Sequence, residues 1–178
     1  GQNGSPISGH LRVTIPNKQG FEKLKNALKI KPALVFDMDG VLINAKSYRE
    51  TIRKTFEYYT GKPVSHEEIQ AVKNKGGMNN DWDLTNYLLE QEGVKVSYED
   101  LVKTFQKIYW DGGRGLINIE TPLFERSLFE KLSKNYNISI FTGRYNLEAH
   151  FAINKFNISD LFYPVITSDN IPSGREKP

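Results

Sequence analysis

The stretch "ALVFDMDGVL", residues 33–42, decides the fold of this chain. Four apolar residues lead directly into two aspartates one residue apart, followed by a glycine and two further apolar residues. A short apolar run bounded by turn residues is consistent with a buried strand. Aspartate is disfavoured in strands, and two carboxylates this close repel each other and are costly to desolvate. A bound cation would offset that repulsion, so the stretch predicts a buried strand that ends at a metal site.

The residues that follow, 47–110, carry the signals of four helices in series with no strand between them. Three helix starts have a serine with an acid three residues later, which is the capping-box pattern. These starts are "SYRE" at 47–50, "SHEE" at 65–68 and "SYED" at 97–100. A further helix is expected from Asp81 to about Glu90, ended by Gly93. The apolar stripe of the first helix is Tyr48, Ile52, Phe56 and Tyr59.

Beyond residue 110, helices alternate with strands. The expected elements are a helix at 123–134 with Leu123, Leu128 and Leu132 inward, a strand at 138–144, a helix at Asn146–Phe156 and a strand within 161–169. This alternation predicts a parallel sheet with right-handed crossovers. We therefore predict an α/β fold with a three-layer Rossmann-like core, formed by residues 33–46 and 111–178, and an α-helical insert at 47–110.

Residues 1–32 form a segment of their own ahead of this core. Leu11–Ile15 predicts a short strand because polar and apolar residues alternate there. A helix follows, and Pro32 ends the segment. The residues on the apolar face of that helix are Phe21, Leu24, Ala27 and Leu28.

The composition narrows the class of protein. The chain has 178 residues, and none of its apolar runs approaches the ~20 residues of a membrane span. The start, "GQNGSPISGH", lacks the basic residues and apolar core of a secretory signal. There is no cysteine, which excludes disulfides, thiolate catalysis and cysteine zinc sites. We expect a cytoplasmic protein that does not bind membranes.

The net charge of +3 comes from one segment. Residues 1–32 contain six basic residues and one acidic residue, whereas the rest of the chain has 18 basic and 20 acidic residues. The main body is therefore slightly acidic, and its charge does not favour a nucleic-acid partner.

Polar side chains follow each of the three strands expected after residue 32. The residues are Asp37 and Asp39 after the first strand, Thr142 and Arg144 after the second, Ser168 and Asp169 after the third, and Lys177 in the next loop. In open parallel sheets, functional groups gather beyond the carboxyl ends of the strands. Two acids, a hydroxyl and a lysine at one edge suit Mg²⁺ and a phosphoryl group, because Mg²⁺ prefers one or two carboxylates with water and phosphate oxygens.

The ordered motifs resemble those of the haloacid dehalogenase (HAD) superfamily of phosphotransferases over residues 33–178. "DMDGVL" at 37–42 matches its first motif, "FTGR" at 141–144 its second, and "GREKP" at 174–178 its third. The insert matches the small α-helical cap of that superfamily. The resemblance implies an Mg²⁺-dependent phosphatase that acts on a small phosphate ester. Its fourth motif, an acid after a further strand, does not follow Lys177, so we expect the C-terminal part of the core to be missing from this chain.

The resemblance also implies roles for single residues. Asp37 would be the nucleophile that forms an aspartyl-phosphate, and Asp39 the general acid and base. Both would hold Mg²⁺, Asp39 through its backbone carbonyl. Thr142 would bind the phosphoryl oxygens and Lys177 would neutralise their charge. The expected phosphate and substrate contacts are Gly40, Gly143, Arg144, Asn79 and Asn80.

A second resemblance covers residues 9–28, "GHLRVTIPNKQGFEKLKNAL". The segment resembles the C-terminal tail of PLP-dependent aminotransferases of the histidinol-phosphate group, in which Arg12 would bind a carboxylate. It implies an aminotransferase fused ahead of the phosphatase, with histidinol phosphate as the substrate and a homodimer as the assembly.

Simpler interpretations stay open for several residues. Asp37 and Asp39 could be a solvated loop, Thr142 a helix cap and Lys177 an exposed lysine. Arg144 could form a surface ion pair instead of binding substrate.

The loop "KGGMNNDWDLT", 75–85, could simply cap the next helix instead of reading the substrate. Tyr109 and Trp110 could be ordinary core residues. The alternatives to a phosphatase are a phosphomutase and a non-catalytic module that binds a phospho-ligand.

Overall fold

The computed structural model describes residues 17–27, 31–78 and 80–170, and its contacts divide the chain into Gly1–Pro32 and Ala33–Pro178. In the first part the structure describes one helix, α1 (Lys18–Ala27), whose start is capped by the Asn17 side chain at 2.8 Å from the Gly20 amide. The predicted strand Leu11–Ile15 lies outside the described residues, and so does Arg12.

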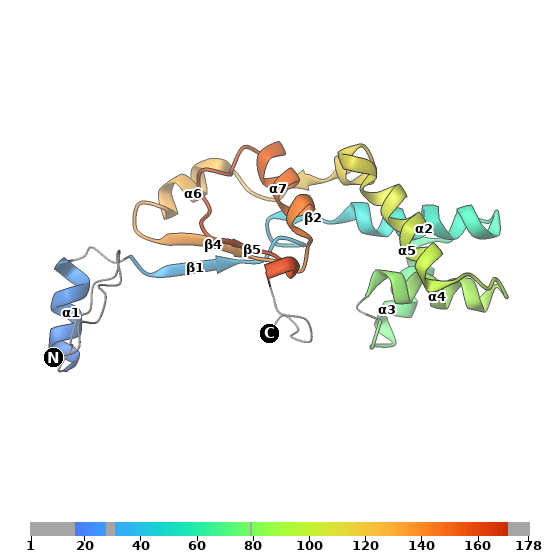
Figure 1. Ribbon diagram of the computed structural model, residues 1–178, viewed down its shortest axis with the longest axis horizontal. Helices are drawn as coiled ribbons and strands as arrows, with labels where there is room; N and C mark the ends of the chain where they lie inside the picture. Colours follow the sequence, from blue (N-terminus) through green and yellow to red (C-terminus); the bar gives the residue numbers. More distant parts are fainter. Residues whose placement is uncertain (1–16, 28–30, 79, 171–178) are drawn as a thin grey trace, which may run out of the picture. The chain divides into compact units, whose positions relative to one another are not determined.

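The second part contains a three-stranded parallel sheet in the order β1-β4-β5 (Figure 1). The strands are β1 (Ala33–Phe36), β4 (Asn137–Phe141) and β5 (Val165–Ile166). Phe36 pairs with Ile140, and Ile140 pairs with Val165. The α/β fold with a parallel sheet, predicted from the alternation of strands and helices, is confirmed.

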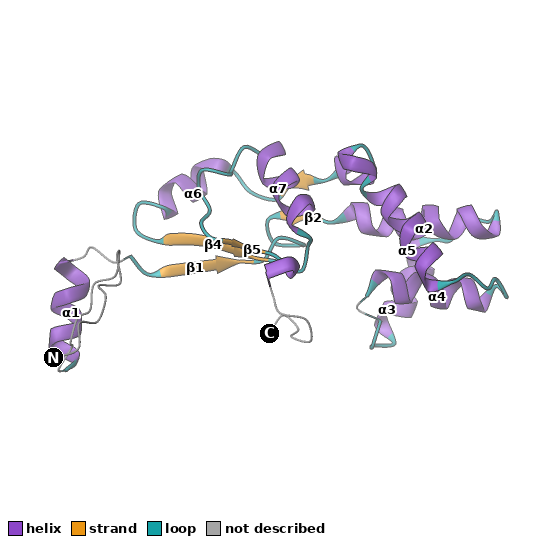
Figure 2. Ribbon diagram, viewed as in Figure 1, coloured by secondary structure: helices purple, strands orange, loops and turns teal. Residues whose placement is uncertain are grey.

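Helices α6 (Arg126–Leu132) and α7 (Asn146–Lys155) pack over one face of this sheet (Figures 1 and 2). The core beneath them is aromatic at its centre. The Phe129 ring meets Phe36 edge-on at 5.3 Å and Phe162 at 4.9 Å between ring centroids. On the other face of the sheet Val35 is 64% exposed.

Of the three leucines predicted to face inward in α6, Leu132 packs against the core as predicted, but Leu123 and Leu128 do not. The helix begins only at Arg126, and Leu123 and Leu128 are 52% and 50% exposed. Phe129 is the buried residue instead, and Leu132 packs beside it. The ring of Phe129 packs edge-on against three other phenylalanines, Phe36, Phe124 and Phe162, and the Leu128 side chain could not make these ring contacts.

The helical insert consists of four helices, as predicted. They are α2 (Lys46–Thr60), α3 (His66–Asn74), α4 (Asp81–Gln91) and α5 (Tyr98–Tyr109). Their shared core includes Ile52, Leu84 and Leu101, each fully buried. The predicted capping box at Ser65 is present, and Ser97 also caps its helix. In the described part of the chain, no helix is long and apolar enough to cross a membrane.

The predicted cap at Ser47 is wrong. Helix α2 starts one residue earlier, at Lys46, and its N-cap residue Ala45 makes no side-chain hydrogen bond. Ser47 lies inside the helix, is fully buried and donates a hydrogen bond to Glu120 Oε1 at 2.6 Å. The local pattern predicted that the Ser47 hydroxyl would bond to the helix backbone. It bonds instead to buried Glu120, which lies 73 positions away in the sequence.

Two short antiparallel strands that the sequence did not predict connect the insert to the core. They are β2 (Ile43–Asn44), just before α2, and β3 (Thr121–Pro122), just before α6. Short 3₁₀ helices follow α5 at Asp111–Gly113 and Leu116–Ile119, and another lies at Ser168–Asn170. The chain therefore enters and leaves the insert through two neighbouring segments.

Candidate active site

The site lies at the carboxyl edge of the sheet, where a tight loop follows β1. The carbonyl of Met38 accepts hydrogen bonds from the amides of Leu42 and Ile43, both at 2.9 Å, and folds the loop back on itself. Gly40 has a φ of +74°, a conformation that favours glycine. The expected tight turn at Gly40 is therefore present, and it sets Asp37 and Asp39 side by side along one short loop.

Asp39 is held by Arg144, which follows β4. The Arg144 guanidinium donates from Nε to both carboxylate oxygens of Asp39, at 3.0 and 3.2 Å, and Nη2 adds a further bond. Residues 105 positions apart are thereby joined across the sheet edge. This paired geometry fixes the direction of the Asp39 carboxylate more firmly than a single hydrogen bond would.

Glu120 binds the other side of the same guanidinium. Arg144 Nη1 donates to Glu120 Oε2 at 2.8 Å and Nη2 donates to Oε1 at 3.0 Å. Glu120 is 3% exposed and also accepts hydrogen bonds from Ser47 and, at 3.4 Å, from the Tyr109 hydroxyl. Glu120 precedes β3, and its bonds to Ser47 and Arg144 link the insert to the carboxyl edge of the sheet.

Arg144 is buried, so the interpretation of a surface ion pair is wrong. Its side chain has no exposed area, and its guanidinium lies 5.5 Å from the ring centre of Tyr48. Burial alone would lower its pKa, but the interactions with Tyr48 and Asp39 hold the pKa above its ordinary value. Removing one partner from a buried ion pair of this kind costs ~3–5 kcal/mol.

The other predicted catalytic groups lie at the same edge. Asp37 is half-buried, and its Oδ1 accepts a hydrogen bond from the Met38 amide at 2.7 Å. Thr142 is fully buried, and its hydroxyl oxygen accepts a bond from the Arg144 amide at 3.2 Å. The hydroxyl proton of Thr142 can therefore point to another acceptor. Ser168 donates to the Arg144 carbonyl at 3.0 Å.

The donor set at this edge suits a magnesium ion that keeps water and substrate oxygens. The donors are the Asp37 carboxylate and the backbone carbonyl of Asp39, since the Asp39 carboxylate is bonded to Arg144. Among the described residues, no group of three or more His, Asp or Glu side chains gathers as a complete metal site. Asp37 and the Asp39 carbonyl are the groups that would hold the ion.

Two of the predicted site residues, Asn79 and Lys177, lie outside the described residues. Asn80 caps α4, because its side-chain oxygen accepts hydrogen bonds from the Trp82 amide at 2.8 Å and the Asp83 amide at 3.4 Å. The capping interpretation of this loop is confirmed for Asn80. The same residue also lines a cavity, so its two interpretations are compatible.

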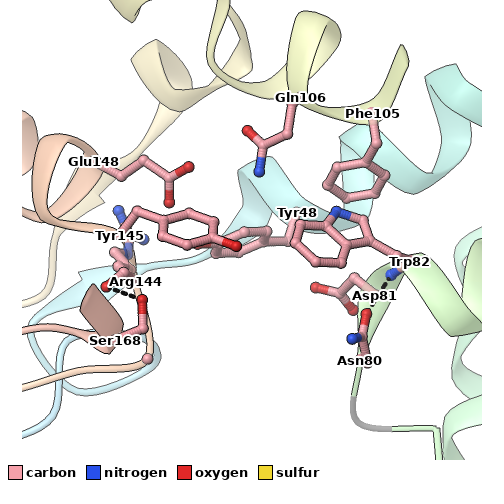
Figure 3. Close-up of a pocket in the computed structure, with 11 residues that line it drawn as sticks. Tyr48, Asn80, Asp81, Trp82, Phe105, Gln106, Arg144, Tyr145, Glu148 and Ser168 are labelled. Carbon is pink, nitrogen blue, oxygen red and sulfur yellow. Dashed lines mark hydrogen bonds between the residues drawn. The ribbon is translucent and has the colours of Figure 1, made fainter. Parts of the chain in front are cut away.

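The cavity has a volume of about 300 Å³ and lies between the insert and the sheet edge (Figure 3). Its lining residues come from α2, α4 and α5 on one side and from the segments after β4 and β5 on the other. Aromatic walls dominate it. They are Tyr48, Trp82, Phe105 and Tyr145. Gly143, Arg144 and Ser168 connect the cavity to the catalytic edge.

Glu148, in the first turn of α7, is an acid of this cavity that the motifs do not include. It is only 6% exposed, and burial raises its pKa to about 7, although the charge of Arg144 acts in the opposite direction. The Tyr145 backbone and the Gln106 side chain also act to lower the pKa of Glu148, but burial outweighs them. Figure 3 shows the Glu148 and Gln106 side chains on the same side of the aromatic rings.

Glu120 and Glu148 were not predicted from the sequence as residues of the site. An acid in the first turn of a helix is ordinary, because it stabilises the helix dipole, so Glu148 gave no signal. Glu120 stands alone in "NIETP". The position of Glu120 could have indicated its role, because it lies directly between an apolar segment and Thr121-Pro122, where the chain returns from the insert to the core.

Comparisons with known proteins agree with this geometry. The model of the family described as haloacid dehalogenase-like hydrolase matches residues 34–178. The solved structure of phosphatase Tt82 from Thermococcus thioreducens has a TM-score of 0.64 and 23% identity, and the match covers 79% of this chain and 74% of that one. At this identity, the likeness concerns the fold alone.

Two curated relatives are also similar in sequence. The imidazoleglycerol-phosphate dehydratase of Phytophthora nicotianae is 32% identical over 149 residues, which cover 79% of this chain. The phosphorylated carbohydrates phosphatase of Thermotoga maritima is 26% identical over 152 residues, which cover 82%. The chain spans 33% of the length of the first relative and 65% of the second.

Proposed function

This chain belongs to the haloacid dehalogenase-like hydrolases through residues 34–178, and we propose that it is a magnesium-dependent phosphatase of a small phosphorylated metabolite. One observation carries the proposal. The parallel pairing of β1 and β4 brings Asp37, Thr142 and the Asp39–Arg144 pair to one edge of the sheet. The phosphatase name of the Thermotoga relative agrees with it.

In the proposed reaction, the Asp37 carboxylate attacks phosphorus and the bond to the alcohol oxygen breaks. Asp39 enters this step protonated and gives its proton to that oxygen, so the alcohol leaves, an aspartyl-phosphate remains and Asp39 becomes the carboxylate that Arg144 holds. Asp39 then takes a proton from water as the water attacks phosphorus, which releases phosphate and restores Asp37. Bound Mg²⁺ would neutralise charge on the phosphoryl oxygens.

Neighbouring residues would position these groups. Arg144 directs the Asp39 carboxylate, and the Thr142 hydroxyl can donate to a phosphoryl oxygen. Lys177 would add a positive charge at the phosphoryl group. Gly40 and Gly143 let the backbone approach the phosphate, because neither carries a Cβ.

A finer proposal names histidinol phosphate as the substrate. The name of the Phytophthora relative pairs an imidazole compound with a phosphate ester, and histidinol phosphate contains both groups. The dehydratase activity itself is not carried over, since the chain spans a third of that protein. The fused aminotransferase and the homodimer stay predictions from residues 9–28, which lie outside the family match.

The test is phosphate release from para-nitrophenyl phosphate, histidinol phosphate and sugar phosphates, with and without Mg²⁺. We expect Mg²⁺-dependent release that Asp37→Asn reduces by at least about 1,000-fold, because removing a nucleophile removes the covalent route. Asp160→Asn makes the same chemical change at an exposed ion pair with Arg126 and should retain full activity.

The other outcomes decide between the alternatives. Transfer of phosphate between positions of a sugar phosphate would identify a phosphomutase. Binding of inorganic phosphate without any release would identify a phospho-ligand-binding module. Equal rates for Asp37→Asn and the unmodified chain would refute the aspartyl-phosphate route.

A further inference from the structure

A second cavity, lined by the proposed catalytic acid Asp39, adjoins the aromatic cavity. The second cavity has a volume of about 350 Å³ and includes Asp39. Both cavities share Tyr48, Asp81, Gly143 and Arg144. A molecule whose phosphoryl group reacts beside Asp39 can therefore extend its alcohol part into the aromatic cavity.

Apart from Asp39, the charged residues that line only one of the two cavities differ in sign. Arg49 and Lys73 line only the cavity that contains Asp39. Glu148 lines only the aromatic cavity. Lys73 is paired with Asp81, so Arg49 supplies the extra positive charge at one end of the site, which suits a phosphoryl group. The other end offers the Glu148 carboxylate.

The shared charged groups are already paired. Asp81 accepts from Lys73 Nζ at 2.8 Å, and Arg144 is bonded to Asp39 and Glu120. Glu148 forms no salt bridge with any of the described residues, and the uncharged amide of Gln106 lines the cavity with it. Because two carboxylates compensate the one charge of Arg144, the ionised Glu148 adds an excess negative charge to the aromatic cavity.

Aromatic rings beside a buried carboxylate are a good environment for a cation. Tyr48, Tyr145 and Trp82 present their rings across the middle of the cavity (Figure 3). A positive group near ring faces is attracted by their quadrupoles, and a desolvated carboxylate adds direct charge pairing. A neutral ligand would leave the cost of burying an ionised Glu148 uncompensated.

We propose that Glu148 selects phosphate esters whose alcohol part carries a protonated nitrogen, which lies between the carboxylate and the rings of Trp82 and Tyr145. This substrate class rests on the proposed phosphatase function. Glu148 is a specificity residue in this proposal and takes no part in the transfer of the phosphoryl group.

The test uses two esters of nearly equal shape, 4-aminobutyl phosphate and pentyl phosphate, which differ by an ammonium group in place of a methyl group. At pH 8 we expect kcat/KM to favour the amino ester by on the order of tenfold. Glu148→Gln should reduce this preference to about one, because the variant no longer attracts the ammonium group and no longer disfavours the neutral ester. The control Glu99→Gln, at an exposed position on α5, should keep the preference.

The pH dependence separates charge selection from a loss of packing. The amine remains protonated between pH 6 and 8, whereas Glu148, with its pKa near 7, becomes neutral toward pH 6. The preference should therefore fall at pH 6 in the unmodified chain and stay flat in Glu148→Gln. The other titratable groups that act on Glu148 or line its cavity are Arg144, Glu120, Tyr48, Tyr145 and Asp81. Arg144 stays charged over this range.

A binding measurement distinguishes failure of this inference from failure of the proposed function. The probes are the product alcohols, 4-aminobutanol and pentanol, followed by NMR at the indole N–H of Trp82. If neither ester is hydrolysed but 4-aminobutanol binds more tightly than pentanol and loses that advantage in Glu148→Gln, the cation site stands and the phosphatase does not. Equal binding of the two alcohols, or an advantage that survives in Glu148→Gln, overturns the cation site.

Discussion

Glu148 also links the site to the pH dependence of folding. Its pKa is raised from 4.5 to about 7, mainly because it is buried. Between these two values the unfolded chain has lost the proton and the folded chain still holds it, so folding becomes less favourable as pH rises through this range. Below pH 4.5 the carboxyl group is neutral in both states and costs nothing.

Replacing Glu148 by glutamine, its neutral amide, should therefore stabilise the folded chain above pH 7. We expect Glu148→Gln to raise the free energy of unfolding by up to about 3 kcal/mol at pH 8 and by less than about 1 kcal/mol at pH 5. Urea unfolding followed by circular dichroism at both pH values measures the difference. Glu99→Gln should show no such pH dependence, and equal stabilisation at both pH values would contradict the assignment.

The sequence could place some residues of the site but not the ones that surround them. Asp37 and Thr142 each follow directly after an apolar run of strand length, so their arrival at one sheet edge follows from the parallel order. The burial of Glu120 and Arg144 depends on packing between segments far apart in the chain. No local pattern distinguishes such residues from exposed charges.

At the scale of elements, the caps of α3 and α4 form a matched pair. Ser65 caps α3 with a capping box, and Asn80 caps α4 through two backbone amides. Only Asn80 also lines the aromatic cavity. Substitutions at the two caps can therefore distinguish a loss of helix stability from a change in the shape of the cavity.

We expect Ser65→Ala and Asn80→Ala each to lower the free energy of unfolding by about 1 kcal/mol, as measured in urea. Only Asn80→Ala should also shift the indole N–H resonance of Trp82, the residue whose amide it caps. An Asn80→Ala chain with unchanged stability would show that the cap does not hold α4.

The existence of the elements was easier to predict than their ends and faces. The start of α2 was misplaced because Ser47 bonds to Glu120 and not to the helix backbone. The face of α6 was partly misassigned because leucines and a phenylalanine offer two similar apolar faces on a seven-residue helix. Aromatic packing with Phe36 and Phe162 selects one of them. The pairing of β2 with β3 involves two residues on each strand, too few to leave a periodic pattern.

At the scale of the whole molecule, the buried residues of Ala33–Pro178 form two clusters. One contains residues of the insert, such as Leu84, and the other contains residues of the sheet and its helices, such as Ile140. The alternation of strands and helices around a helical run was enough to predict both. Because the insert and the core each have their own buried cluster, we expect the two to unfold separately.

Hydrogen exchange tests this separation. Leu84→Ala should cost about 2–5 kcal/mol in the insert, because Leu84 is fully buried. Amides of α2, α4 and α5 should exchange faster, whereas those of β4 should keep most of their protection. Ile140→Val should show the reverse order, with a smaller loss. Equal acceleration in both clusters would show that insert and core unfold as one unit.

The placement of the two tryptophans has an optical consequence. The chain contains only Trp82 and Trp110. Trp82 lines the aromatic cavity, whereas Trp110 meets the Phe151 ring of α7 edge-on at 5.5 Å. In a Trp110→Phe chain, emission from Trp82 would report binding of a ligand in the cavity. In a Trp82→Phe chain, emission from Trp110 would report whether the insert keeps its contact with α7. Intrinsic fluorescence can therefore follow occupancy and insert movement separately, without any attached dye.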